Sequence, residues 1–194
     1  MDLIRQRVAL TLEYADPMGF LAALRNAEPL VAASGLEAAI RHLRTRELRE
    51  WKHTREAALF CHGLSGLIGF PVLLGRQEAQ DYDFVARCIV GSADSFLFVQ
   101  LKEVVPPDLS AKASVQAAID RLEKYVDSKD LTVALYLNRP VRFDPRTITL
   151  PTVPLAGLWV FGAITSDRLE WALWGDLLTT REGIRFRYPG SEMG

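Results

Sequence analysis

Two β-rich runs in the middle of the chain lie so close together in sequence that they constrain the fold more than any other feature. They span residues 82–90 and 95–105, with Gly91-Ser92-Ala93-Asp94 between them. A short connection rich in turn-forming residues is typical of two antiparallel strands joined in a hairpin. Pro106-Pro107 ends the second strand, because proline cannot donate to the strand ladder. We therefore expect a β-hairpin at the centre of the fold.

The segments on either side of this hairpin complete an α/β pattern. A stretch rich in Arg, Glu, Leu and Ala predicts a helix over about 47–67, and an apolar run predicts a strand over about 70–74. After the hairpin, apolar residues at helical spacing predict a helix over 110–126, and a compact strand follows at 131–137. The order from Glu47 to Leu137 is therefore helix, three strands, helix, strand.

The remaining sequence adds helices before this region and strands after it. Asp16-Pro17 predicts a helix start ahead of residues 18–27, and a second helical stretch runs from about Pro29 to His42. We expect residues 1–45 to form an N-terminal helical extension packed on one compact α/β domain of residues 46–194. In that domain, 158–164 predicts a further buried strand, and the apolar spacing of 168–178 leaves helix and strand open.

The composition is that of an ordinary globular protein: 49% of its 194 residues are hydrophobic and 24% are charged. The longest apolar run, 155–164, is about half the length of a membrane-spanning helix. Cys61 and Cys88 lie in apolar stretches and predict free, buried thiols, and the first residues lack the pattern of a signal peptide. We expect a cytoplasmic protein with no membrane segment. Its net charge of −1 means that any nucleic-acid contact must come from a local patch.

Three polar residues stand out on the hairpin strands, which are otherwise strongly apolar. Asp83 lies near the start of the first strand, and Gln100 and Lys102 lie two residues apart on the second. Residues at i and i+2 share one face of a strand, so these side chains can converge on one point. Convergence requires an even number of residues in the turn; with residues 92–95 in the turn, Val85 would oppose Lys102 and Arg87 would oppose Gln100. An odd turn without a bulge would send Asp83 to the other face.

An Asp on one strand followed by Gln-x-Lys on the next resembles the signature of the PD-(D/E)xK nuclease superfamily, the glutamine variant included. The element order over about 47–137 is similar to the common core of that superfamily, so the resemblance implies an α/β, restriction-endonuclease-like fold. It further implies a metal centre holding Mg²⁺ or Mn²⁺, with Asp83, the Gln100 side-chain oxygen and the Leu101 carbonyl as ligands. Lys102 would hold the attacking water or help to deprotonate it. Glu56, on the preceding helix, would act on a second ion or through water.

The chain departs from the family pattern at two positions. Gln100 replaces the more usual acid, which removes one negative charge and should weaken metal binding. Some active nucleases, among them a transposon end-cutting subunit, share this glutamine. Tyr82 stands before Asp83, at a position where the family name has proline and where the family varies.

The strongest basic cluster covers residues 41–55, with six Lys or Arg against two Glu. Interpreted as a nucleic-acid contact, it would bind the phosphate backbone through Arg44, Arg49, Lys52 and Arg55. In the alternative interpretation the cluster is a solvent-exposed helix that does not bind nucleic acid. Glu56 has a second interpretation too, because Lys52 lies four residues earlier and an exposed helix ion pair would explain it.

These observations favour a divalent-metal-dependent phosphodiesterase, an endonuclease that acts on DNA. One alternative is a catalytically inactive member of the same fold that serves as a nucleic-acid-binding or protein-assembly module. Another is a globular interaction protein in which the hairpin residues are structural and Asp83 is a strand-edge carboxylate bonded to backbone. If the chain is a nuclease, we expect its specificity to come from a homodimer or a partner subunit.

Overall fold

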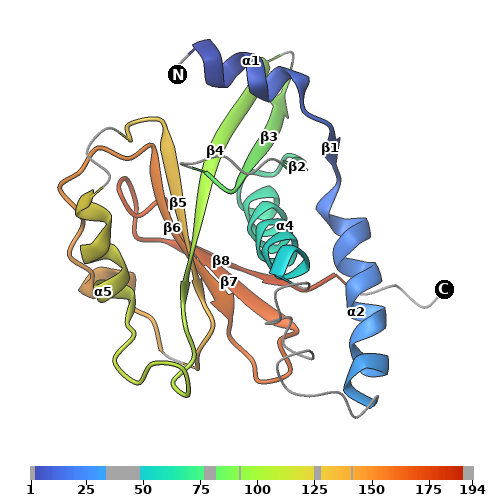
Figure 1. Cartoon of the computed structure of the whole chain (residues 1–194), viewed down its shortest axis with the longest axis vertical. Coiled ribbons are helices and arrows are strands. Elements are labelled where there is room, and N and C mark those ends of the chain that lie inside the picture. The colour runs from blue at the N-terminus through green and yellow to red at the C-terminus, as the bar shows by residue number, and fades with distance from the viewer. Residues whose placement is uncertain are drawn as a thin grey trace.

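A computed structural model describes residues 3–33, 49–76, 82–91, 93–124, 128–140 and 142–189. Over these residues the chain forms an eight-stranded mixed sheet with helices on both faces (Figure 1). Helices α4 and α5 lie on opposite sides of the sheet. The chain is thus of the mixed α/β class.

The expected hairpin is present as β3 (Phe84–Val90) and β4 (Ala93–Val104). Val90 pairs with Ala93, so only two residues form the turn, and Gly91 has a φ of 63° that suits glycine in such a turn. The predicted turn was longer, because Ala93 and Asp94 were counted with it. They belong to β4, where the Asp94 carboxylate accepts a hydrogen bond of 3.0 Å from Arg87 Nε on the facing strand. The number of turn residues is even, as convergence requires.

The predicted element order is confirmed around this hairpin. It runs α4 (Arg49–Ile68), β2 (Val72–Gly75), β3, β4, α5 (Val115–Asp120) and β5 (Leu131–Leu137). The helix after β4 is shorter than the predicted 110–126 and is followed by a 3₁₀ turn, η1 (Arg121–Lys124). It begins late because the Ser114 side chain accepts a hydrogen bond from Ala117 N and so caps the helix there. Residues 125–127 lie outside the described residues.

The strands occur in the sheet in chain order. β6 (Gly157–Ala163), β7 (Glu170–Trp174) and β8 (Gly183–Arg187) extend the sheet beyond β5, and η2 (Pro145–Thr147) is a short 3₁₀ turn between β5 and β6. The β4–β5 and β5–β6 pairs are parallel and the others are antiparallel. The strand predicted at 158–164 is confirmed. Residues 168–178, for which the sequence did not decide between helix and strand, contain the strand β7.

The N-terminal segment contributes a strand as well as helices. Between α1 (Leu3–Thr11) and α2 (Pro17–Ala33), β1 (Tyr14–Ala15) pairs with β2 at the edge of the sheet. The helix start at Asp16-Pro17 is confirmed, and the Asp16 side chain accepts a hydrogen bond from Met18 N at 2.9 Å. The prediction that a second helix begins at Pro29 was wrong, because α2 runs through that position to Ala33. Residues 34–42, where that second helix would continue, lie outside the described residues.

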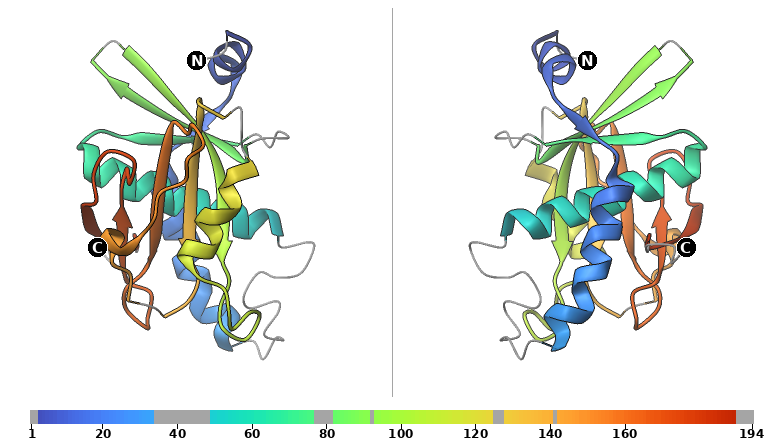
Figure 2. Two further views of the ribbon diagram at one scale, coloured as in Figure 1. Left: turned by 90° about the vertical axis from the view of Figure 1, so that its left-hand side faces the viewer. Right: turned by 90° about the vertical axis from the view of Figure 1, so that its right-hand side faces the viewer.

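Two hydrophobic cores lie on the two faces of the sheet. On the α4 face, Phe60 packs edge-on against Phe84, Trp159 and Phe161. On the α5 face, Ile119 and Leu122 pack against inward-facing residues of β5 and β6. The β3–β4 hairpin projects from this body, as the side views show (Figure 2). The strand ends that carry the polar residues are therefore anchored in a well-packed sheet.

Two further expectations concern cysteine and membrane segments. Cys61 and Cys88 are free and buried, as predicted. None of the helices in the described part of the chain is long and apolar enough to cross a membrane.

Candidate metal centre on the hairpin

Asp83 lies at the point where the β3–β4 ladder ends. Its backbone N–H donates to the carbonyl of Val99 at 2.8 Å, and Val99 is the residue that pairs with Phe84, the first residue of β3. Its carboxylate oxygen Oδ2 accepts hydrogen bonds from Gln100 Nε2 at 2.5 Å and from the Leu101 backbone N–H at 2.7 Å. Peptide groups two residues apart on a strand face the same neighbour, so Leu101 faces the β3 side as Val99 does. The Asp83 carboxylate thus takes the place of the next backbone partner.

The pairing differs from the register derived for a four-residue turn. Val85 opposes Phe98 and Arg87 opposes Phe96, so neither faces Gln100 or Lys102. The register shifts by about four residues because the turn lies between Val90 and Ala93, so it begins one residue earlier and ends three residues earlier than a turn of 92–95. In the observed register the Asp83 and Gln100 side chains are in contact at the end of the ladder.

Alternation along β4 assigns the polar side chains to the two faces of the sheet. Phe98 and Val104 belong to the core on the α5 face, whereas Val99 belongs to the core on the α4 face. Gln100 and Lys102 therefore project toward the α5 side. Asp83 reaches Gln100 and the Leu101 backbone from the strand end, and Lys102 shares the side of Gln100.

Glu56 lies on the other face of the sheet, in the middle of α4. Its side chain is buried, and Lys52 Nζ lies 3.7 Å from its Oε1. The predicted ion pair is thus present, but it is buried rather than exposed. Burial raises the pKa of Glu56 from 4.5 to about 7, against the opposing effects of Lys52 and Arg55. Among the described residues, no hydrogen bond to Glu56 Oε1 is present.

Sequence reasoning missed Glu103, which organises the polar groups around Lys52. Glu103 Oε2 lies 2.5 Å from Lys52 Nζ, and its Oε1 accepts a hydrogen bond from Asn138 Nδ2 at 2.5 Å. Asn138 Oδ1 in turn accepts from the Tyr136 hydroxyl at 3.3 Å and from Arg168 Nη2 at 3.2 Å. Its position could have indicated this role. Residues two apart on a strand project to the same face, so Glu103 lies on the α4 face with Leu101.

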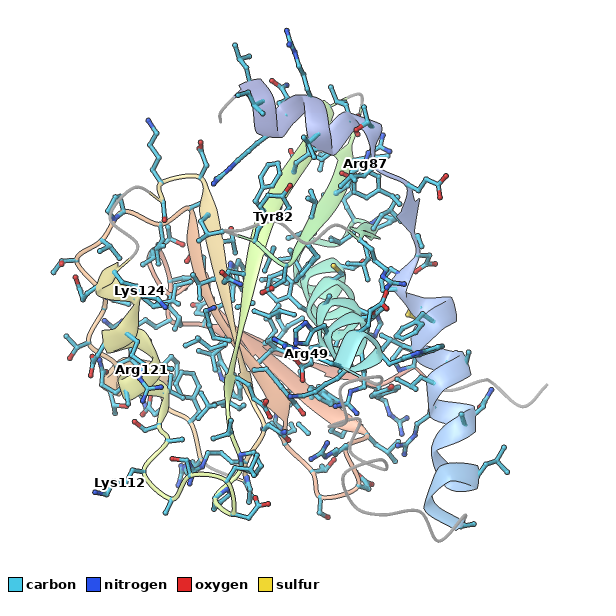
Figure 3. The ribbon with its side chains drawn as sticks, in the orientation of Figure 1. Arg49, Tyr82, Arg87, Lys112, Arg121 and Lys124 are labelled. Atoms are coloured by element: carbon cyan, nitrogen blue, oxygen red, sulfur yellow. The ribbon has the colours of Figure 1, made fainter. Side chains whose placement is uncertain are left out.

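A cavity of about 510 Å³ opens beside Asp83, between the start of α4 and the ends of β2 and β3. Its walls are formed by Arg49, Glu50, His53, Thr54, Ala57, Leu74, Arg76, Asp83, Phe84 and Leu101. Arg49 lies on the first turn of α4, at the end that faces the viewer in Figure 3. Arg76 forms an ion pair with Glu50. Asp83 and Leu101 therefore border a space whose lining also includes Arg49, His53 and Arg76, whereas Gln100 and Lys102 are not among its lining residues.

The structure describes three of the four predicted nucleic-acid-binding residues and places them in different surroundings. Arg49 is exposed and lines the cavity. Lys52 is turned inward to Glu103 and Glu56, and Arg55 Nε is buried. Arg44 lies outside the described residues. His53 and Arg76, which sequence reasoning did not single out, complete the basic wall; His53 follows Arg49 by one helical turn, a spacing that could have indicated it.

The residues around Asp83 fit a hard divalent cation. The Asp83 carboxylate, the Leu101 carbonyl and the Gln100 carboxamide oxygen, once that amide turns over, offer the oxygen ligands that Mg²⁺ prefers. Both hydrogen bonds to Asp83 end on Oδ2, so neither uses Oδ1. The set holds one carboxylate, and within the described ranges no three or more His, Cys, Asp or Glu side chains gather as metal ligands. A cation here would keep several of its waters, for which the adjoining cavity has room.

Comparison with known proteins assigns the chain to no family. No protein-family model matches it, and no curated protein or solved structure is significantly similar to it. The function must therefore be inferred from the geometry of the site.

Proposed function

We propose that the chain is a divalent-metal-dependent phosphodiesterase, an endonuclease that acts on DNA, built on a restriction-endonuclease-like core. The observation that carries this proposal is the convergence of Asp83, Gln100 and Leu101 at the end of the hairpin, where the Asp83 carboxylate accepts hydrogen bonds from the other two residues. The PD-(D/E)xK resemblance assigns these three groups to one metal ion. The observed order of α4, β2, β3, β4, α5 and β5 supports the same proposal.

Each residue of the site has its own role in the proposed reaction. Asp83, the Leu101 carbonyl and the Gln100 carboxamide oxygen hold Mg²⁺ or Mn²⁺. A cation bound there supplies Lewis acidity, lowering the pKa of a coordinated water and offsetting charge on the scissile phosphate. Lys102, on the same side of β4 as Gln100, holds the attacking water or helps to deprotonate it. Glu56 forms an ion pair with Lys52 inside the protein. Its proposed role is therefore to hold α4 in position beside the site.

The DNA backbone would enter along the basic wall of the Asp83 cavity. Arg49, His53 and Arg76 line it, and the overall charge of −1 makes such a local patch necessary. We propose that a second copy of the chain or a partner subunit supplies specificity.

One observation favours the inactive alternative, a nucleic-acid-binding or protein-assembly module. The Asp83 carboxylate is already bonded by Gln100 and Leu101, as a purely structural strand-end carboxylate would be. Gln100 also leaves the site with one acid fewer than the family pattern. Such a module would bind DNA through Arg49 without cutting it.

Nicking of a supercoiled plasmid in Mg²⁺ or Mn²⁺ distinguishes the two functions. The wild type is compared with Asp83→Asn and Lys102→Ala, with circular dichroism to confirm that each variant is folded. Asp94→Asn is the matched control, because Asp94 is an aspartate at the turn end of the same hairpin and pairs with Arg87 away from the site.

We expect nicking by the wild type and Asp94→Asn, and a loss of about 100-fold or more in the two site variants, the scale of removing a positioned catalytic group. Equal nicking by all four proteins overturns the assignment. If no protein nicks the plasmid and each binds DNA unless Arg49 is replaced by Gln, the chain is the inactive module.

A further inference from the structure

A second cavity, of about 710 Å³, lies where the three mutually parallel strands end. Its lining includes Pro106 after β4, Asn138 after β5 and Ile164 after β6. The carboxyl ends of parallel strands form a common ligand-binding edge in α/β proteins, and the volume falls within the usual range of small-molecule sites. None of the residues that line the Asp83 cavity lines this one.

The charged residues of this cavity are all cationic. Arg139, Arg142 and Arg168 line it, and among the residues that the structure describes none that lines it is Asp or Glu. Asp144, two residues after Arg142, is engaged by Arg146 at 2.8 Å. Three guanidinium groups around one space, without a carboxylate in its walls, select an anionic ligand.

Two of these arginines are held in place and still have N–H groups to offer. Arg139 Nη1 donates to the backbone carbonyls of Ser110 and Ala113. Arg168 Nη2 donates to Asn138 Oδ1 at 3.2 Å. Each set of contacts uses one terminal nitrogen of a guanidinium group that carries five N–H donors. The side chains are thus pre-positioned to bind an anion through their other nitrogens, which reduces the entropy lost on binding.

The lining also contains aromatic residues. Phe143 and Trp174 contact each other edge to face, with ring centroids 5.0 Å apart, and both are only partly buried. Gly162, Ala163 and Ile164 continue this apolar surface. Aromatic side chains of this kind stack on the flat face of a nucleobase. A ligand that fits both parts carries an anionic group and a planar apolar group.

We propose that this cavity binds a nucleotide, with its phosphate on Arg139, Arg142 and Arg168 and its base against Trp174 and Phe143. The nucleotide is either free or the 5′-terminal nucleotide of a nucleic-acid strand, since both present the same phosphate and base. The site is independent of the hairpin chemistry and stands whether or not the hairpin cuts DNA.

Isothermal titration calorimetry of the full chain tests this site. The ligands are adenosine 5′-monophosphate, adenosine, and a single-stranded oligonucleotide with and without a 5′-phosphate. The variants are Arg142→Gln and Arg168→Gln; Arg139 is left in place because it holds the backbone at Ser110 and Ala113. Arg121→Gln is the matched control, an exposed arginine on η1, labelled in Figure 3, that is not among the residues lining the cavity.

We expect the monophosphate to bind at least about 10-fold more tightly than adenosine, and each cavity variant to weaken it by about 10-fold, as loss of one charge-assisted phosphate contact would. The control should bind as the wild type does. Tighter binding of the 5′-phosphorylated strand than of the monophosphate identifies a strand end as the ligand, and the reverse identifies a free nucleotide. Equal binding of phosphorylated and unphosphorylated ligands, or no binding at about 1 mM, would falsify the proposal.

Discussion

The Asp83 carboxylate and the Gln100 carboxamide face each other across the end of the β3–β4 hairpin, with Oδ2 and Nε2 2.5 Å apart. The same carboxylate oxygen also accepts the Leu101 backbone N–H. Without a cation these contacts close the end of the strand ladder. In the proposed metal site the ligands would instead be the Asp83 carboxylate, the Gln100 carboxamide oxygen and the Leu101 carbonyl, so the two roles predict different responses to metal and to substitution.

Replacing Asp83 should destabilise the hairpin. In Asp83→Ala the Leu101 N–H and the Gln100 amide lose their acceptor, and an unsatisfied, partly buried donor costs about 1–3 kcal/mol. Urea denaturation at neutral pH measures this loss. Asp94→Ala, which removes a solvent-accessible ion pair, should change stability by no more than about 1 kcal/mol. If Asp83→Ala is as stable as the Asp94 variant, the Asp83 contacts do not hold the hairpin.

Restoring the acid at position 100 should make the fold respond to Mg²⁺. In Gln100→Glu two carboxylates face each other at the distance of a hydrogen bond, and their repulsion should lower Tm by about 3–6 °C. Added Mg²⁺ should recover that loss, because a cation between the carboxylates removes the repulsion. The readout is Tm by differential scanning fluorimetry with and without MgCl₂.

Gln116→Glu provides the control for this metal response. Gln116 Nε2 also donates to an aspartate, Asp120, at 2.7 Å, but on the exposed surface of α5. It should lose a comparable contact without gaining a specific response to Mg²⁺. If MgCl₂ raises the Tm of both variants to the same degree, the effect is general screening of charge rather than binding of Mg²⁺ at a specific site.

Glu56 should make stability depend on pH. Its pKa is about 7 in the folded protein against 4.5 for the ordinary group, so folding favours the protonated form. The resulting stabilisation is complete below pH 4.5 and is lost as the pH rises through 7, up to about 3 kcal/mol in total. Glu56→Gln lacks this loss, so the wild-type minus variant difference in unfolding free energy should fall over that window. A constant difference from pH 4.5 to pH 8 contradicts the assignment of the pKa.

Phe60 should be among the most sensitive positions of the α4-face core. Its ring contacts Phe84, Trp159 and Phe161 at centroid distances near 6 Å. Phe60→Ala removes a fully buried ring and should cost about 3–5 kcal/mol. Phe70→Ala is the comparison, because that ring is 43% exposed, and it should cost much less. Similar midpoints for the two variants in urea would show that α4 does not anchor the sheet as described.

Local signals in the sequence were enough to predict the hairpin and the order of elements around it. Glycine and proline mark the turn after β3 and the end of β4, and apolar spacing marks the helices. The start of α5 was not predictable from spacing alone, because the Ser114 cap competes with apolar residues that continue the helical pattern. The passage of α2 through Pro29 likewise contradicts the local helix-start signal.

The candidate site was predictable in part. The i, i+2 rule assigned Gln100 and Lys102 to one side of β4, and Asp83 contacts Gln100 at the end of the hairpin. The inward turn of Lys52 to Glu103 was not predictable, because it depends on a strand and a helix that meet only in the folded protein. For the same reason the residues of a basic run could not be sorted into exposed Arg49 and buried Lys52.

The most direct measurement is the rate of plasmid nicking as a function of Mn²⁺ concentration for the wild type, Gln100→Glu and Asp83→Asn. The site described here predicts nicking that saturates with Mn²⁺ in the wild type, saturates at a lower concentration in Gln100→Glu because a second carboxylate binds the ion, and is lost in Asp83→Asn. Nicking by Asp83→Asn with the same Mn²⁺ dependence as the wild type would contradict a metal-dependent nuclease centred on Asp83.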